Sequence, residues 1–338
     1  MTRYIVKKII DMIITIFIIV LIVFAMFELI PGNPARIMLG MNASNAQVAA
    51  LEAELGLDKS IFVKIYTYFS DLFNGDLGFS FRFQRPVIEL ITEALPYTLF
   101  LALYAFFFII ILAIPLAILA ARKPNSKLDN FIRISSETCL AIPPFFMAII
   151  LMLIFRTSQL ALQGGSVDFD LNNAFQSYWM PALAIALSRL AMAMEFLRDS
   201  IIEQRESDYV KTAIGKGASR SRVMFFHIFR NSLVPFITAL GLILAEVFSG
   251  SIIIEQVFLI PGLGRSLVTA VEARDFQLTQ GIVLLIAFIV VFVNFCVDLI
   301  NQFIDPRIRE QNKKLYKSRN TFFLRMKNQA NLDSQKKR

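Results

Sequence analysis

The chain has few of the residues that build metal or redox sites. Its 338 residues include two cysteines, Cys139 and Cys296, and one histidine, His227. Both cysteines lie inside apolar runs, where cysteine usually serves as a small packing residue. A single histidine has too few partners to form a metal site. We therefore expect no metal and no cofactor, and a local role for His227 in its own loop.

Catalytic motifs are absent as well. The sequence contains no Gly-x-x-x-x-Gly-Lys-Ser/Thr loop, the motif that cradles ATP phosphates. It also offers no Ser/His/Asp set suited to hydrolysis. We therefore expect a protein that is not an enzyme and that does not hydrolyse ATP on its own.

Apolar residues are what the chain has in excess. They make up 56% of it, more than the roughly 45–50% of ordinary soluble domains. They gather in charge-free runs long enough to cross a hydrocarbon core of about 30 Å as helices. We expect an all-α, polytopic membrane protein with six transmembrane helices, at about residues 9–30, 95–121, 136–155, 178–197, 233–254 and 276–297.

Basic residues favour one side of the membrane. The N-terminus and the loops after the second and fourth spans are rich in Lys and Arg, whereas residues 158–177 contain neither. Short basic loops stay in the cytoplasm. We therefore expect a multi-pass protein of the cytoplasmic (inner) membrane with both termini in the cytoplasm. The tail, residues 305–338, holds eleven basic and three acidic residues. Such a tail favours contact with anionic membrane lipid over nucleic acid.

Two spans contain a charged residue. Arg189 lies in the fourth span, and a charge at the bilayer centre costs roughly 2.5–3.5 kcal/mol on the insertion scale. This helix should therefore face protein or water, either as a pore-lining helix or as one buried in the bundle. Glu246 lies in the fifth span. We expect both side chains to face the interior as a pair near a transport pathway; the alternative is that each snorkels to an interface.

Residues 31–93 form a long segment that this orientation places outside the cytoplasm. Ser44 and Gln47 make a capping box that starts one helix. Ser60 starts a second, whose apolar residues recur every three to four positions. We expect two short amphipathic helices over the membrane domain, serving as a structural cap or as a docking surface for a delivery protein.

A polar, basic segment at residues 200–232 separates the fourth and fifth spans. Ser207 or Asp208 can cap a short helix to Lys216, and Gly217 permits the positive φ that ends it. Ser219 can cap a second helix toward Asn231. This helix–glycine–helix hairpin would either dock on another protein or rest on lipid headgroups.

The hairpin resembles the signature loop of permease subunits of binding-protein-dependent ABC importers. The family pattern, loosely Glu-Ala-Ala, three residues, then Gly, corresponds to Lys211-Thr212-Ala213 and Gly217, with Lys in place of Glu. The Lys-Thr-Ala variant is similar to the dipeptide/oligopeptide/nickel branch. Other stretches resemble the same branch: Phe27-Glu28-Leu29-Ile30-Pro31-Gly32-Asn33-Pro34, Leu55-Gly56-Leu57-Asp58, Gly75-Asp76-Leu77-Gly78-Phe79-Ser80, Glu255-Gln256-Val257-Phe258, Pro261-Gly262-Leu263-Gly264, Asp298 and Asp305-Pro306-Arg307-Ile308-Arg309.

The resemblance implies a type I importer (MetI-like) permease fold and alternating access. It also implies a second homologous permease subunit, two cytoplasmic ATP-binding subunits and an extracytoplasmic substrate-binding protein. The resemblance further implies that residues of the hairpin couple the permease to the ATPase: Tyr209, Lys211, Thr212, Ala213, Lys216, Gly217 and Ala218. The implied organisation is a first transmembrane helix at 1–30, an extracytoplasmic insert at 31–93, a permease domain at 94–304 with the coupling loop 200–232, and a basic tail at 305–338.

The branch implies di- and oligopeptides as the transported substrate. Nickel or other metal chelates, glutathione and other small solutes are alternatives. An ion-coupled secondary transporter is a more distant alternative, since such proteins usually show inverted repeats and broken helices, and no repeat is visible here.

Overall fold

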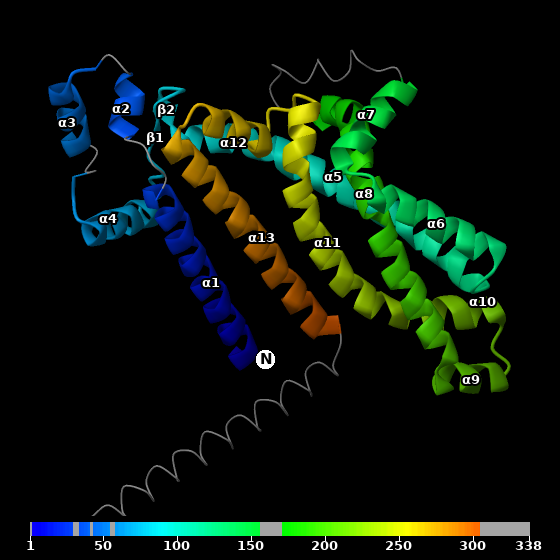
Figure 1. Ribbon diagram of the computed structural model, residues 1–338. Helices are drawn as coiled ribbons and strands as arrows, with labels where there is room; N and C mark the ends of the chain where they lie inside the picture. The colour runs from blue at the N-terminus through cyan, green and yellow to red at the C-terminus, as the bar shows by residue number, and fades with distance from the viewer. Residues whose placement is uncertain (1, 30–33, 41–42, 55–57, 156–170, 305–338) are drawn as a thin grey trace, which may run out of the picture.

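The computed structural model describes residues 2–29, 34–40, 43–54, 58–155 and 171–304 (Figure 1). The expectations for Pro31, for Gly56 and for the tail fall outside these residues, as does most of the loop 158–177. The first elements are α1 (Thr2–Leu29), α2 (Pro34–Leu39), α3 (Asn45–Glu54), α4 (Ile61–Phe73), β1 (Phe79–Ser80), β2 (Arg85–Pro86), α5 (Val87–Arg122) and α6 (Lys127–Ala141). The remaining elements are α7 (Pro144–Phe155), α8 (Leu171–Glu206), α9 (Asp208–Gly215), α10 (Arg220–Arg222), the π-helix η2 (Val223–Phe229), α11 (Arg230–Val257), α12 (Leu263–Glu272) and α13 (Phe276–Ile304).

Five stretches of continuous helix within the described residues are long and apolar enough to cross a membrane: α1, α5, α8, the unit α10–η2–α11, and α13. A sixth span has the required composition but is bent by 107° between α6 and α7. The sequence predicted a span at about 136–155 and did not specify a bend. The break falls at Pro143-Pro144, because proline lacks the N–H of the helix ladder and excludes the helical conformation from the residue before it. Ile142 accordingly has φ −84° and ψ 123°.

Contacts at both ends of α5 and α8 show that α6 and α7, the bent pair, must carry the chain back across the bundle. Near their starts, the rings of Phe100 and Phe175 meet edge-on with centroids 5.0 Å apart. Near their ends, Arg198 of α8 pairs with Asp129, which lies just after α5. Both helices therefore run in the same direction, and α6 with α7 provides the return. The expectation of six spans is confirmed, with one of them bent.

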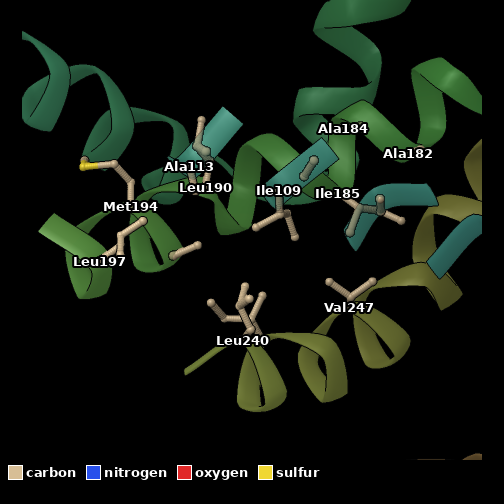
Figure 2. Close-up of a cluster of buried hydrophobic side chains, with 14 of the residues drawn as sticks. Ile109, Ala113, Ala182, Ala184, Ile185, Leu190, Met194, Leu197, Leu240 and Val247 are labelled. Carbon is tan, nitrogen blue, oxygen red and sulfur yellow. The ribbon is translucent and has the colours of Figure 1, made fainter. Parts of the chain in front are cut away.

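The core lies where α5, α8 and α11 meet. Figure 2 shows Ile109 and Ala113 of α5 among side chains of α8, with Leu240 and Val247 of α11 below them. Small residues let helix backbones approach closely inside a membrane. Both helices contain fully buried alanines: Ala102, Ala105, Ala113, Ala117 and Ala120 on α5, and Ala182, Ala184, Ala186, Ala191 and Ala193 on α8.

This packing explains the low hydrophobicity of the fourth span. Within the best 18-residue window of α8, 67% of residues are buried inside the chain, against 11% in α1 and in α13. This burial agrees with the prediction that the fourth span faces protein or water rather than lipid. A helix with few lipid contacts does not need a continuous apolar surface, so alanine and a charged residue are tolerated there.

Helices α1 and α13 form the periphery and lie side by side (Figure 1). Lys8, near the start of α1, forms an ion pair with Asp298, near the end of α13. The start of α1 and the end of α13 therefore lie at the same face of the bundle. This arrangement agrees with an even number of crossings.

The insert, residues 31–93, contains the two expected helices, α3 and α4, and a further short helix, α2. Ser44 and Gln47 form the predicted capping box: the Ser44 N–H donates to Gln47 Oε1 at 3.0 Å, and the Gln47 N–H donates to Ser44 Oγ at 3.3 Å. Ser60 occupies the N-cap position of α4, but its side chain makes no capping hydrogen bond. The sequence analysis did not predict the short hairpin of β1 and β2.

That hairpin attaches the insert to α13. The buried Ser80 hydroxyl donates to Asp275 Oδ2 at 2.5 Å, and the Phe79 N–H donates to Gln277 Oε1 at 3.0 Å. Gly78 has φ +85°, and a Cβ at this position would lie 3.0 Å from the Gln277 side chain. The Gly-Asp-Leu-Gly-Phe-Ser stretch therefore requires its second glycine both for backbone conformation and for close approach.

Candidate functional site

The hairpin at the end of α8 has a helix–glycine–helix geometry. Gly217 has φ +79°, as predicted. The Gly217 N–H donates to the Ile214 carbonyl at 2.9 Å, and the Ala218 N–H donates to the Ala213 carbonyl at 3.1 Å. These two bonds are the Schellman pair that ends α9. Ser219 then caps the next helix by accepting the Arg222 N–H at 3.4 Å.

One face of the hairpin packs inward. Val210 is buried, and Ala213 and Ala218 are half-buried against the core. The Tyr209 hydroxyl lies 2.8 Å from Gln204 Oε1 and 3.3 Å from the His227 carbonyl oxygen, and it shares its proton between them. Tyr209 thus links α9 to the end of α8 and to η2. The role of Val210 was not anticipated, although a lone valine among polar residues was a usable signal.

The other face is open to solvent. Lys211, Thr212, Lys216 and Gly217 are exposed, and a Cβ added at Gly217 would meet no atom within 4 Å. Lys211 Nζ donates to Asp208 Oδ1 at 2.9 Å, which lowers the pKa of the Asp208 carboxyl. The seven residues predicted for coupling therefore divide between an anchoring face and an accessible face. Their part in coupling stays a prediction.

The second helix of the hairpin was predicted to run toward Asn231. It does so, and it continues through η2 into α11 without a break. Pro235 lies inside the helix and removes one backbone donor. Nearby side chains satisfy backbone carbonyls of this stretch: Asn231 Nδ2 donates to the His227 carbonyl at 2.9 Å, and Ser232 Oγ donates to that of Ile228 at 3.0 Å. The accessible face thus continues directly into a span.

The sequence also did not reveal three exposed apolar side chains. Ile214 lies on α9, and Phe225 and Phe226 lie on η2. A π-helix is rare and usually occurs at functional positions. No periodicity in the sequence marks it, because its altered spacing covers only residues 223–229. These side chains extend the accessible face with an apolar surface.

A buried ion pair secures the C-terminal half of α8. Arg198 Nε lies 2.7 Å from Asp129 Oδ1, and Arg198 Nη2 lies 2.6 Å from Asp129 Oδ2. Asp129 also accepts the Asn125 N–H at 2.7 Å. Further along α8, Arg205 Nη1 donates to the Arg122 carbonyl at 3.2 Å. The turn between α5 and α6 is thereby joined to the helix that leads into the hairpin. None of these partners was predicted.

Arg189 and Glu246 face each other across the α8–α11 contact. Arg189 Nη1 lies 3.2 Å from Glu246 Oε2, and both side chains are partly exposed. The structure therefore brings together the two charged residues that the sequence analysis singled out. A partly exposed pair between two core helices suits a position near a pathway, and that role stays a prediction.

A second buried carboxylate joins α5, α11 and α12. The Glu255 carboxylate accepts a hydrogen bond from the Thr98 hydroxyl at 2.7 Å and another from the Gly264 N–H at 2.7 Å. Thr98 Oγ1 in turn accepts the Leu263 N–H at 2.8 Å. A Cβ at Gly262 would lie 2.4 Å from Glu255 Oε2. The Glu-Gln-Val-Phe and Pro-Gly-Leu-Gly stretches therefore form one interaction that holds the start of α12.

Comparison with protein families matches nearly the whole chain. Residues 113–310 match the family described as "Binding-protein-dependent transport system inner membrane component". Residues 1–102 match its N-terminal companion, described as "Binding-prot-dependent transport system membrane comp, N-term". The motifs of the hairpin and of the α11–α12 junction both fall inside the first match.

Several named relatives cover most of the chain. The probable D,D-dipeptide transport system permease protein DdpB of Escherichia coli is 36% identical, over 85% of this chain and 92% of the relative. The dipeptide transport system permease protein DppB of Haemophilus influenzae is 34% identical, over 91% of this chain and 100% of the relative. The glutathione transport system permease protein GsiC of Salmonella paratyphi A is 32% identical, over 91% of this chain and 99% of the relative.

A solved structure shares the fold. The chain resembles one from the inward-facing MetNI methionine ABC transporter, with a TM-score of 0.53 and 15% identity. The match covers 64% of this chain and 96% of that one. At this identity the likeness concerns only the arrangement of helices, and it agrees with the type I importer fold expected from the sequence.

Proposed function

This chain belongs to the family of inner-membrane components of binding-protein-dependent transport systems, and on that premise we propose that it forms part of an ATP-driven path for peptide import. It is a multi-pass membrane protein and a non-catalytic permease subunit. The peptide substrate is supported by the relatives named for dipeptide and D,D-dipeptide transport. The proposed complex contains a second permease, two ATP-binding subunits and an extracytoplasmic substrate-binding protein.

The observation that carries the mechanism is the continuity between the hairpin and the bundle. Its accessible face, which includes Thr212, Lys216 and Gly217, lies between α8 and the unbroken unit α10–η2–α11. A rigid helix moves as a unit, so displacement of this face by an ATP-binding subunit would reach the α8–α11 contact where Arg189 and Glu246 lie. The proposed result is alternating access, and the proposed orientation places both termini in the cytoplasm.

Docking can be tested by crosslinking in the assembled transporter. Cysteines at Thr212 and Lys216 should crosslink to an ATP-binding subunit, whereas a cysteine at Thr92, an exposed residue near the opposite end of the bundle, should not. Absence of any crosslink from Thr212 or Lys216 in an active complex would contradict the proposed docking.

Substrate and energy source are tested together by reconstitution. Uptake of a labelled dipeptide into proteoliposomes should require the binding protein and ATP, and it should cease when the ATP-binding subunits cannot hydrolyse ATP. Uptake driven by an ion gradient alone would contradict the proposal. Glutathione, itself a tripeptide, is the second candidate because of the 32%-identical relative named for it. Competition between labelled dipeptide and unlabelled glutathione distinguishes the two.

A further inference from the structure

Helix α4 carries aromatic side chains on two neighbouring faces. On one face, the Phe69 ring stacks on Phe17 of α1 with centroids 5.0 Å apart, and the Tyr68 ring lies 5.7 Å from that of Phe24. Three more aromatic side chains are left open by the chain: Phe62, Tyr66 and Phe73 are 80%, 76% and 88% exposed. At 3.6 residues per turn these three fall within an arc of about 40°. They form one continuous aromatic stripe.

The contacts with α1 set the depth of α4 in the membrane. Asp11 is the last charged residue of α1 before a charge-free run that extends to Phe27, and a charge inside the hydrocarbon is costly. At 1.5 Å per residue, Phe17 lies about 9 Å and Phe24 about 20 Å beyond Asp11. Both therefore lie inside a hydrocarbon core about 30 Å thick, and in the proposed orientation, with the N-terminus cytoplasmic, Phe24 lies in its outer half. Rings that pack on them lie at the depth of the acyl chains.

The direction and polarity of α4 agree with this depth. Figure 1 shows α4 crossing α1 toward the end of α1 that is remote from the N-terminus. The polar residues Thr67 and Asp71 are exposed, and at 100° per residue they lie roughly 120–160° from the centre of the stripe. A helix with one aromatic and one polar face, held at the edge of a bilayer, suits the boundary between acyl chains and headgroups.

We propose that α4 is an interfacial helix whose aromatic stripe (Phe62, Tyr66 and Phe73) inserts into the acyl chains of the outer leaflet. The insert is then held at two points, by the membrane through α4 and by the bundle through the Ser80–Asp275 contact. This assignment differs from both roles expected for the insert, since α4 is then neither a cap on the bundle nor the surface that receives a delivery protein.

Spin-label accessibility in the reconstituted transporter tests the assignment. Cys139 and Cys296 are replaced by alanine, and single cysteines are introduced as Tyr66→Cys and Phe73→Cys on the stripe. Thr67→Cys and Asp71→Cys are the matched controls on the polar face. Each variant is first checked for ATP-dependent uptake, and two positions on each face keep the comparison usable if one variant fails to assemble.

We expect nitroxides at 66 and 73 to be relaxed by oxygen and protected several-fold from a water-soluble nickel chelate, with the reverse at 67 and 71. Stripe labels that the chelate reaches freely would place the face in water and overturn the proposal. Stripe labels shielded from both oxygen and the chelate would show that another protein subunit covers the face, which would also overturn it.

Discussion

Arg198 and Asp129 form two parallel hydrogen bonds, at 2.7 and 2.6 Å, between the C-terminal half of α8 and the start of α6. The Asp129 side chain is fully buried and that of Arg198 nearly so. The hairpin begins at Ser207, nine residues after Arg198 and directly after the end of α8. The pair therefore fixes the position of the part of α8 from which the hairpin extends. It therefore offers a direct test of how the bundle positions its coupling surface.

Replacing Asp129 by Asn should destabilise the protein strongly. It leaves the guanidinium of Arg198 with only the exposed Asp199 carboxylate, 2.7 Å from its Nη1, and loss of a buried partner typically costs about 3–5 kcal/mol. Arg198→Lys should also be harmful, because an ammonium cannot form the paired geometry. Thermal unfolding of the purified transporter measures the effect. Glu89→Gln, which breaks the exposed pair with Arg85, is the control and should change stability by at most about 1 kcal/mol. Similar losses in both variants would contradict a special role for the buried pair.

Gly217→Val should separate ATP hydrolysis from transport. Gly217 has φ +79° and open space around its Cα, so the penalty comes from the backbone and is roughly 1–2 kcal/mol, more for a β-branched side chain. The distorted hairpin should lower peptide uptake per ATP hydrolysed in proteoliposomes. Gly217→Asn should be milder, because asparagine tolerates this conformation.

Gly215→Ala is the control for this experiment. Gly215 also has open space around it but lies in α9 without a positive φ, so alanine should be neutral or slightly stabilising. Normal coupling in Gly217→Val would refute the assignment of Gly217. Equal damage from Gly215→Ala would show that the hairpin rejects any side chain here, whatever its backbone conformation.

Neutralising Arg189 and Glu246 together should be less harmful than the two single changes predict. Each single variant leaves one charge in the bundle without its partner at 3.2 Å, whereas Arg189→Gln with Glu246→Gln removes both. Contacting residues typically show coupling of about 0.5–3 kcal/mol. The initial rate of ATP-driven peptide uptake provides the measurement. Strictly additive effects would count against the pair acting as a unit.

Gly262→Ala should prevent proper closure of the junction between α11 and α12. Its Cβ would lie 2.4 Å from Glu255 Oε2 and 2.7 Å from Thr98 Oγ1, and both of these atoms are engaged in buried hydrogen bonds. Thr98→Val leaves the Leu263 N–H without an acceptor and should cost about 1–3 kcal/mol. Yield and thermal stability of the purified protein report both effects.

Gly250→Ala provides the comparison for the junction, because a Cβ there meets nothing within 4 Å. It should leave yield and thermal stability unchanged. If Gly262→Ala behaved like Gly250→Ala, the close approach to Glu255 would not be important for folding.

Much of the site could be predicted from short-range patterns. The turn at Gly217, the cap at Ser219 and the capping box of Ser44 and Gln47 depend on neighbours within a few residues, so the sequence contains all of their chemistry. The partners of Asp129 and Glu255 could not be predicted this way. Asp129 and Arg198 are separated by 69 residues, and the pair exists only because α5 and α8 run in the same direction.

The sequence by itself determined the membrane spans, the low lipid exposure of the fourth span and the glycine turn of the hairpin, because hydrophobicity, charge cost and backbone sterics act locally. Only the tertiary structure decided the 107° bend between α6 and α7, the unbroken path from η2 into α11, and the packing of α4 on α1. These depend on which helices meet. A proline can bend a span or lie within one, and an aromatic helix can be covered by protein or lipid. Packing between distant segments selects one outcome in each case.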